Sequence, residues 1–191
     1  MHSDEYAEML QEVHAGRRED KKWGTTGARN FGDQVCKFLE HRRGYIRSVL
    51  DFGAGQQSLG KYVADNAVDV RTRWYDYDPG IPAISKLPEG PFDAIVSSDV
   101  LEHIEPDQVD ATLDQLFELA GRAQYHHIAC SECGMTLPDG RNAHLTVEEP
   151  KWWLEKFDRP GWTVMYFAEQ YTRRRGKLTP EAVILIEKDG S

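Results

Sequence analysis

A short apolar run that ends in glycines is the feature of this sequence most suggestive of chemistry. Val49-Leu50-Asp51-Phe52 is followed at once by Gly53-Ala54-Gly55. A buried strand ending in such a turn lets a ligand approach the backbone, because glycines lack β-carbons, and the amides of a following helix attract anions. About twenty residues later, Asp76 ends the next strand signal, where its carboxylate can accept hydrogen bonds from both hydroxyls of a ribose. The spacing predicts a nucleotide-type site; a plain strand–helix turn capped by Asp51 is the alternative.

Two further motifs follow the glycine turn in order. They are Tyr75-Asp76-Tyr77-Asp78-Pro79 and the longer Phe92-Asp93-Ala94-Ile95-Val96-Ser97-Ser98-Asp99-Val100-Leu101-Glu102-His103-Ile104. Together with Asp51-x-Gly53-x-Gly55, they resemble class I methyltransferases that use S-adenosylmethionine (SAM), over roughly residues 48–129. The resemblance implies a Rossmann-like sheet, SAM as cofactor, and methyl transfer to a nucleophilic O, N, S or C atom. A nicotinamide dehydrogenase is disfavoured because the first motif lacks the G-x-G-x-x-G pattern.

The resemblance also implies which residues hold the cofactor: Trp23, Gly24, Asp51, Gly53, Gly55, Gln57, Asp76, Tyr77, Asp78, Ser98 and Asp99. Gln57 departs from the family, because many members have a third glycine there, and we expect the side-chain amide of Gln56 or Gln57 to contact the ligand. The stretch between Asp76 and Phe92 is short and rich in proline, which predicts a truncated helix and third strand. The candidates for contacting the adenine are Tyr77, Asp78, Ile81 and Leu87, with core or loop packing as the alternative for the last two.

A narrower resemblance lies mostly outside this region. It consists of Trp23-Gly24-Thr25-Thr26-Gly27, Asp76-Tyr77-Asp78-Pro79-Gly80-Ile81-Pro82, Leu137-Pro138-Asp139-Gly140-Arg141-Asn142-Ala143-His144-Leu145 and Trp152-Trp153. These segments resemble a compact subgroup of poorly characterised bacterial and phage proteins. That subgroup implies no substrate.

Two histidines are candidates for the general base that an acceptor hydroxyl or protonated amine would need. His103 follows the third strand signal and His144 ends an Asp-Gly-Arg-Asn-Ala-His loop; histidine titrates near neutral pH, which suits the role. The alternative for His103 is packing at a helix start. The candidate acceptor-binding residues are Arg141, Asn142, His144 and Trp152. An arginine can clamp a phosphate or carboxylate and a tryptophan can form an aromatic wall, with a stabilised turn and core packing as the respective alternatives.

The cysteines do not predict a metal site. The chain has three, Cys36, Cys130 and Cys133, which indicates free thiols rather than a disulfide framework. Cys130-x-x-Cys133 lies near His126 and His127, but a structural zinc ion needs four ligands and no second pair completes the set. On a strand, moreover, two adjacent histidines point to opposite faces. Cys130 could instead line a pocket.

The elements that position these residues alternate between strand and helix. Strand signals cover residues 48–52, 70–75, 92–98, 125–129, 163–167 and 182–187, and helical periodicity covers 28–41, 59–67, 109–120 and a segment around Trp152, Trp153 and Phe157. This order predicts an α/β, Rossmann-like fold: a mainly parallel sheet with helices on both faces, a C-terminal antiparallel strand pair and a shortened middle section.

The 191 residues suffice for one domain with a sizeable core. We expect residues 1–27 to form an N-terminal arm or lid, with Tyr6 and Trp23 closing over the cofactor, and residues 28–191 to form a single SAM-binding domain. The net charge of −9 argues against non-specific binding to nucleic acid or anionic membranes. No secretory signal or membrane span is evident, so a cytoplasmic location is expected.

Three functions are compatible with these features. The first is methyl transfer from SAM to a small-molecule, glycan or nucleotide acceptor. The second is transfer of another part of SAM, such as its aminocarboxypropyl group. The third is a SAM-binding module without turnover, which Gln57 and the short middle section keep open. The sequence does not identify the acceptor or the oligomeric state.

Overall fold

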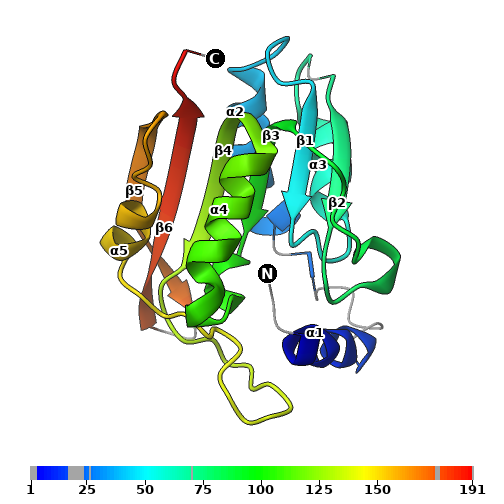
Figure 1. Ribbon diagram of the computed structural model, residues 1–191, viewed down its shortest axis with the longest axis vertical. Helices are drawn as coiled ribbons and strands as arrows, with labels where there is room; N and C mark the ends of the chain where they lie inside the picture. The colour runs from blue at the N-terminus through cyan, green and yellow to red at the C-terminus, as the bar shows by residue number, and fades with distance from the viewer. Residues whose placement is uncertain (1–3, 17–23, 26, 70, 175–176, 191) are drawn as a thin grey trace.

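The computed structural model describes residues 4–16, 24–25, 27–69, 71–174 and 177–190. A six-stranded sheet in the order β2-β1-β3-β4-β6-β5 forms its centre (Figure 1). Its strands are β1 Ser48–Phe52, β2 Arg73–Tyr77, β3 Phe92–Ser98, β4 Ala120–Ala129, β5 Trp162–Arg174 and β6 Lys177–Lys188. Strands β1 to β4 pair in parallel, whereas β6 runs antiparallel to both β4 and β5. The predicted α/β class, the mainly parallel sheet and the C-terminal antiparallel pair are confirmed.

Helices cover both faces of the sheet because the strands are apolar on both sides (Figure 1). The α-helices are α1 Asp4–Gly16, α2 Gly32–Glu40, α3 Ser58–Asn66, α4 Val109–Leu119 and α5 Pro150–Lys156. Val49 of β1 packs in a core cluster with side chains of α2 and α3, and its neighbour Leu50 packs in another with side chains of α4 and α5. This alternation follows from the two-residue period of a strand.

Shorter helical turns connect these elements: the π-helical turn η1 Gly27–Phe31 and the 3-10 turns η2 Pro82–Ile84, η3 Leu101–His103 and η4 Pro106–Gln108. The connection from β2 to β3 contains only η2, so the shortened middle section is present as predicted. Several boundaries differ from expectation. Strands β5 and β6 extend well beyond the expected ranges 163–167 and 182–187, β5 to Arg174 and β6 from Lys177. Strand β2 begins at Arg73 and includes Asp76 and Tyr77, and β4 begins at Ala120, where the helical pattern was expected to end. Hydrogen bonding to β1 and β3 sets the ends of β2 and β4.

Helix α1 lies beyond the carboxyl ends of the parallel strands, apart from the two main core clusters (Figure 1). Tyr6 is completely buried there against Leu137 and Ala143 of the long loop between β4 and α5. The arm and this loop therefore close over the edge of the sheet where the sequence places its functional residues. None of the helices that the structure describes has the length and apolarity needed to cross a membrane.

Candidate functional site

A cavity of about 490 Å³ opens at the carboxyl edge of the parallel strands. Its wall comes from α1, the turns after β1, β2 and β3, and the loop between β4 and α5. The lining residues are Leu10, His14, Gly24, Gly27, Asn30, Asp51, Gly53, Ala54, Gly55, Ser58, Leu59, Asp78, Pro79, Ser98, Asp99, Val100, His103, Cys133, Met135 and His144. The volume lies within the range of about 300–1,000 Å³ typical of small-molecule sites.

The turn after β1 needs its glycines for packing inside the protein. Gly53 and Gly55 have φ of 82° and 52°, in the left-handed region that favours glycine. A β-carbon on Gly53 would overlap the Val100 side chain, and one on Gly55 would lie 2.5 Å from the carbonyl oxygen of Gly24. Contacts with Val100 and Gly24 thus occupy the space that the missing β-carbons leave, while the backbone from Gly53 to Gly55 still faces the cavity.

The amides of this turn are already bonded within the protein. The N–H groups of Gly53 and Ala54 both donate to the carbonyl of Tyr77, at 2.8 and 2.9 Å. The Gly55 amide donates to Asp78 Oδ2 at 2.9 Å, and the Gln56 amide donates to the Gly24 carbonyl at 2.9 Å. These four amides are therefore engaged within the protein, and Ser58 and Leu59 at the start of α3 also line the cavity.

Two buried oxygens on the cavity wall have no hydrogen-bond partner among the described residues: Asp51 Oδ2 and Ser98 Oγ. Burial, together with the nearby carboxylates of Asp76 and Asp78, raises the pKa of Asp51 well above its usual value. Unpaired buried polar atoms are costly, so this wall suits a ligand that carries hydrogen-bond donors or positive charge.

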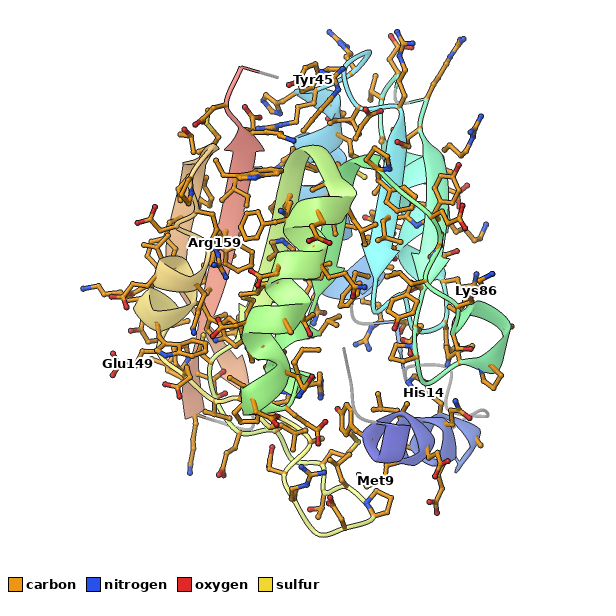
Figure 2. The ribbon with its side chains drawn as sticks, in the orientation of Figure 1. Met9, His14, Tyr45, Lys86, Glu149 and Arg159 are labelled. Atoms are coloured by element: carbon orange, nitrogen blue, oxygen red, sulfur yellow. The ribbon has the colours of Figure 1, made fainter. Side chains whose placement is uncertain are left out.

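The acidic residues at the end of β2, Asp76 within the strand and Asp78 just after it, differ in their relation to the cavity. Asp76 lies beside Asp51 in the β1–β2 register, but its carboxylate accepts hydrogen bonds from Gln57 Nε2 at 2.9 Å and Trp74 Nε1 at 3.1 Å and is not among the lining groups. Asp78 does line the cavity, with Oδ1 accepting from the Gly80 amide at 2.8 Å. His14 of α1 faces the sheet and brings Nε2 to 3.9 Å from Asp78 Oδ1 (Figure 2).

A buried charged network supports the end of β3. Asp99, in the left-handed conformation with φ of 56°, bonds His127 Nδ1 at 3.1 Å, and Glu181 bonds His127 Nε2 at 3.0 Å. Burial disfavours the charged imidazole, but these two carboxylates outweigh it and raise the pKa of His127 to about 9. The ring also stacks on Phe31 with centroids 3.6 Å apart. His126 points to the other face, bonded to Ser97 and Gln124, so the two histidines diverge as expected.

The two histidines predicted as bases, His103 and His144, lie next to each other at the end of the cavity formed by the loop between β4 and α5, called the loop end below. Their rings lie edge to face with centroids 4.8 Å apart. His103 Nδ1 bonds the carbonyl of Ala143 at 2.7 Å, and His144 Nδ1 bonds the carbonyl of Ser131 at 2.5 Å. His144 Nε2 lies 4.0 Å from Glu102 Oε1.

The groups around His144 have unusual acidities. Burial opposes the charge on His144, yet the Cys133 thiol and the Glu102 carboxylate together raise its pKa to about 9. Burial also raises the pKa of Cys133, but contacts with His144 outweigh this effect and lower it to about 7. Burial, reinforced by Asp99, raises the pKa of Glu102 to about 7. Sequence reasoning missed Glu102 as a site residue, although the third motif contained it.

Several predicted residues lie away from the cavity wall. Arg141 is half exposed and pairs with Asp139 at 2.5 Å, and Asn142 braces the loop by bonding the backbones of Cys133 and His144. Trp152 packs edge to face on Trp153 in α5, at 4.9 Å. Two of the predicted cofactor-binding residues also lie away from the wall: Gln57 donates a hydrogen bond to Asp76, and the ring of Tyr77 packs on Phe52. A third, Trp23, lies outside the described residues.

The acceptor candidates therefore separate into His144, which lines the cavity, and Arg141, Asn142 and Trp152, which do not. Of the two expected lid residues, Trp23 lies outside the described residues, and Tyr6 of α1 packs against the loop between β4 and α5 without lining the cavity. Leu10 and His14 from the same helix do line it. The adenine candidates also separate, because Asp78 lies on the wall and Tyr77 and Leu87 pack against the core.

No family model matches the chain, and no curated protein matches its sequence. Solved structures, in contrast, match it over most of its length. One is the 1,6-didemethyltoxoflavin-N1-methyltransferase of Burkholderia thailandensis, solved with 1,6-didemethyltoxoflavin and S-adenosylhomocysteine. Its TM-score is 0.64 at 17% identity, covering 96% of this chain and 89% of that one.

Two more matches have a similar extent. The magnesium protoporphyrin IX methyltransferase of Synechocystis PCC 6803, with bound S-adenosylhomocysteine, has a TM-score of 0.57 at 17% identity, covering 86% of this chain and 84% of that one. The [4+2]-cyclase SpnF has a TM-score of 0.56 at 14% identity, covering 82% and 81%. Because this set includes a cyclase, the fold alone does not define the reaction. The chain has the Rossmann-like fold of class I SAM-dependent methyltransferases.

Proposed function

We propose that this protein is a SAM-dependent methyltransferase acting on a small-molecule, glycan or nucleotide acceptor. The observation that carries the proposal is the pair of unpartnered buried oxygens, Asp51 Oδ2 and Ser98 Oγ, on the wall of a cavity at the carboxyl edge of this fold. When bound, SAM supplies an electrophilic methyl group. The chain's own residues hold the two reactants in line and exclude water.

Asp51 and Ser98 hold the amino-acid end of the cofactor beside the Gly53 turn. Asp76 takes the ribose once the exposed Gln57 side chain moves off its carboxylate. Asp78 shapes this region by holding the amides of Gly55 and Gly80. Leu10 and His14 of α1 close the cavity from the solvent side.

The acceptor enters from the side where His103 and His144 meet. A general base must be unprotonated before the reaction. His144, with its pKa raised to about 9, carries a proton at neutral pH and so serves as a hydrogen-bond donor to the acceptor. His103 is then the residue that receives a proton from the acceptor.

Calorimetry with SAM and S-adenosylhomocysteine tests the cofactor assignment. Asp51→Asn and Ser98→Ala should each weaken binding by about 1–3 kcal/mol, because each variant leaves cofactor groups unpaired. Lys61→Ala, at an exposed position of α3 outside the wall, is the control. Absence of micromolar binding to either compound would refute the proposal.

Asp76 and Gln57 should respond in opposite directions. Asp76→Ala removes the ribose acceptor and should weaken SAM binding by about 1–3 kcal/mol. Gln57→Ala removes the group that competes for the same carboxylate and should strengthen binding. Equal affinities for both variants and the parent protein would assign the ribose to another residue.

Incubation with methyl-labelled SAM and a metabolite extract tests the reaction itself. Methyl transfer places the label in an extract component. Transfer of the aminocarboxypropyl group instead leaves the label on the sulfur of the nucleoside product, and a binding module transfers nothing. Product mass separates the first two outcomes.

A further inference from the structure

We propose that Glu102, His103 and His144 form a binding site for a divalent transition-metal ion at the loop end of the cavity. Each residue offers one ligand atom, and these three atoms all lie within 4.8 Å of one another. None of the three residues is assigned to SAM, so metal binding can be tested without the cofactor. With an ion bound, His103 and His144 act as its ligands, and its open coordination position replaces the roles toward the acceptor that are proposed above for the two rings.

Both imidazoles are held in the orientation that metal ligands adopt. A carbonyl oxygen can only accept a hydrogen bond, so Nδ1 of His103 must donate to Ala143 and Nδ1 of His144 must donate to Ser131. An ion that binds here displaces the proton that His144 otherwise carries on Nε2, because only the unprotonated nitrogen has a lone pair for a metal. Metal-binding histidines commonly donate their second ring nitrogen in this way, which fixes both the tautomer and the direction of the ring.

The carboxylate of Glu102 supplies the second, independent observation. This residue has no exposed surface, and its Oε1 accepts a hydrogen bond from the Ala129 amide at 3.2 Å. Oε2 has no hydrogen-bond partner within the described part of the chain. A buried carboxylate oxygen without a partner is costly, and a cation bound beside it would offset that cost.

The backbone holds the three ligands together without help from an ion. Glu102 and His103 are neighbours in the short turn η3. The loop that carries His144 is tied to this turn because the Thr146 amide donates to the Glu102 carbonyl at 3.0 Å and the Thr146 hydroxyl donates to the Ile104 carbonyl at 2.7 Å. Preorganisation of this kind favours binding, since little order has to be created when the ion arrives.

The ligand set points to a class of metal. Two imidazole nitrogens with one carboxylate oxygen occur in zinc and non-haem iron sites, whereas Mg²⁺ and Ca²⁺ prefer oxygen ligands alone. Three protein ligands leave at least one coordination position open. His103 and His144 both line the cavity, so that position faces the space where the acceptor would lie.

The experiment uses the full chain, treated with a chelator and then freed of it, without SAM. Zn²⁺ is titrated by calorimetry against a competing chelator, and Co²⁺ is titrated by visible absorption, which reports nitrogen and oxygen coordination. We expect one ion per chain. Glu102→Gln, His103→Ala and His144→Ala should each lower the affinity at least about tenfold. Mg²⁺ should not compete.

His14→Ala is the matched control, because His14 lines the same cavity but lies outside the triad. It should bind Zn²⁺ like the parent protein. Glu102→Gln keeps the side-chain volume, and a thermal scan checks its folding: Zn²⁺ should raise the Tm of the parent protein and not that of this variant. Cys133→Ser should also retain binding, because the thiol is not one of the three ligands.

Equal Zn²⁺ affinity in the parent protein and all three ligand variants would overturn the proposal. So would a parent protein that binds neither Zn²⁺ nor Co²⁺. Zn²⁺ binding without SAM binding would support the metal site while refuting the proposed function. The two proposals can therefore fail separately.

Discussion

At the carboxyl edge of the sheet, several single residues lower the stability of the fold in a way that a bound ligand would relieve. Asp51, Ser98 and Glu102 each bury an oxygen that no described partner satisfies. Such atoms lower the stability of a folded chain unless a ligand reaches them. Asp51 and Ser98 line the cavity, and Glu102 lies beside His103 and His144 on its wall, which is the reason that this edge is the candidate site.

His127 should make stability depend on pH. Its pKa is about 9 in the folded protein and about 6.5 when unfolded, so the folded state binds the proton more tightly. The resulting stabilisation, at most roughly 3 kcal/mol, is fully present below about pH 6.5 and is lost as the pH rises through about 9. Chemical unfolding between pH 6 and 10 measures it. His127→Gln should reduce this dependence to the part that His144 contributes, whereas His41→Gln, on the exposed surface, should leave it unchanged.

Gly53→Ala should destabilise the fold by about 2–4 kcal/mol, combining the cost of a left-handed alanine with overlap against Val100. Gly44→Ala is the matched control. Gly44 has a similar φ of 77° but open space around its Cβ position, so that variant should lose only about 1–2 kcal/mol. Urea unfolding measures both losses. If Gly53→Ala and Gly44→Ala lost the same free energy of unfolding, the Val100 side chain would be able to move aside at no cost in stability.

At the scale of elements, α1 is separable from the core. Its Tyr6 belongs to a small cluster with the loop between β4 and α5, distinct from the clusters on the two sheet faces. Leu10 and His14 on the same helix line the cavity. The helix therefore contributes to closing the site more than to holding the sheet together.

Tyr6→Ala should release α1 and weaken SAM binding, while the main unfolding transition changes little. The physical reason is that the variant removes a buried aromatic anchor from the small cluster alone. Calorimetry and hydrogen exchange of the α1 amides measure the two effects. Glu8→Ala, on the exposed side of the helix, is the control. A large drop in global stability would contradict the separation of α1 from the core.

At the scale of the whole molecule, SAM should stabilise the chain by mass action. At a free concentration one hundred times the Kd, one site adds about 2.7 kcal/mol to the free energy of unfolding. A rise in Tm with SAM that Asp51→Asn reduces would link the stabilisation to this cavity. An unchanged Tm at saturating SAM would argue against a native-state site.

Much of the fold could be predicted because strand and helix periods are local properties of the chain. The runs at residues 48–52 and 92–98 became β1 and β3, and the helical pattern after residue 109 became α4. Boundaries were less predictable: β2 and β4 extend beyond their apolar cores because hydrogen bonds from neighbouring strands continue past the hydrophobic residues.

The sequence by itself determined the α/β class and the glycine turn after β1, and it singled out His103 and His144 as candidate bases. The first two follow from periodicity and from the backbone freedom of glycine, and the last follows from the acid–base chemistry of imidazole. Only the tertiary structure decided that Asp78 rather than Asp76 lines the cavity and that Glu102 joins the two histidines. Those outcomes depend on contacts between segments that are distant in the sequence, and no local pattern of residues predicts such contacts.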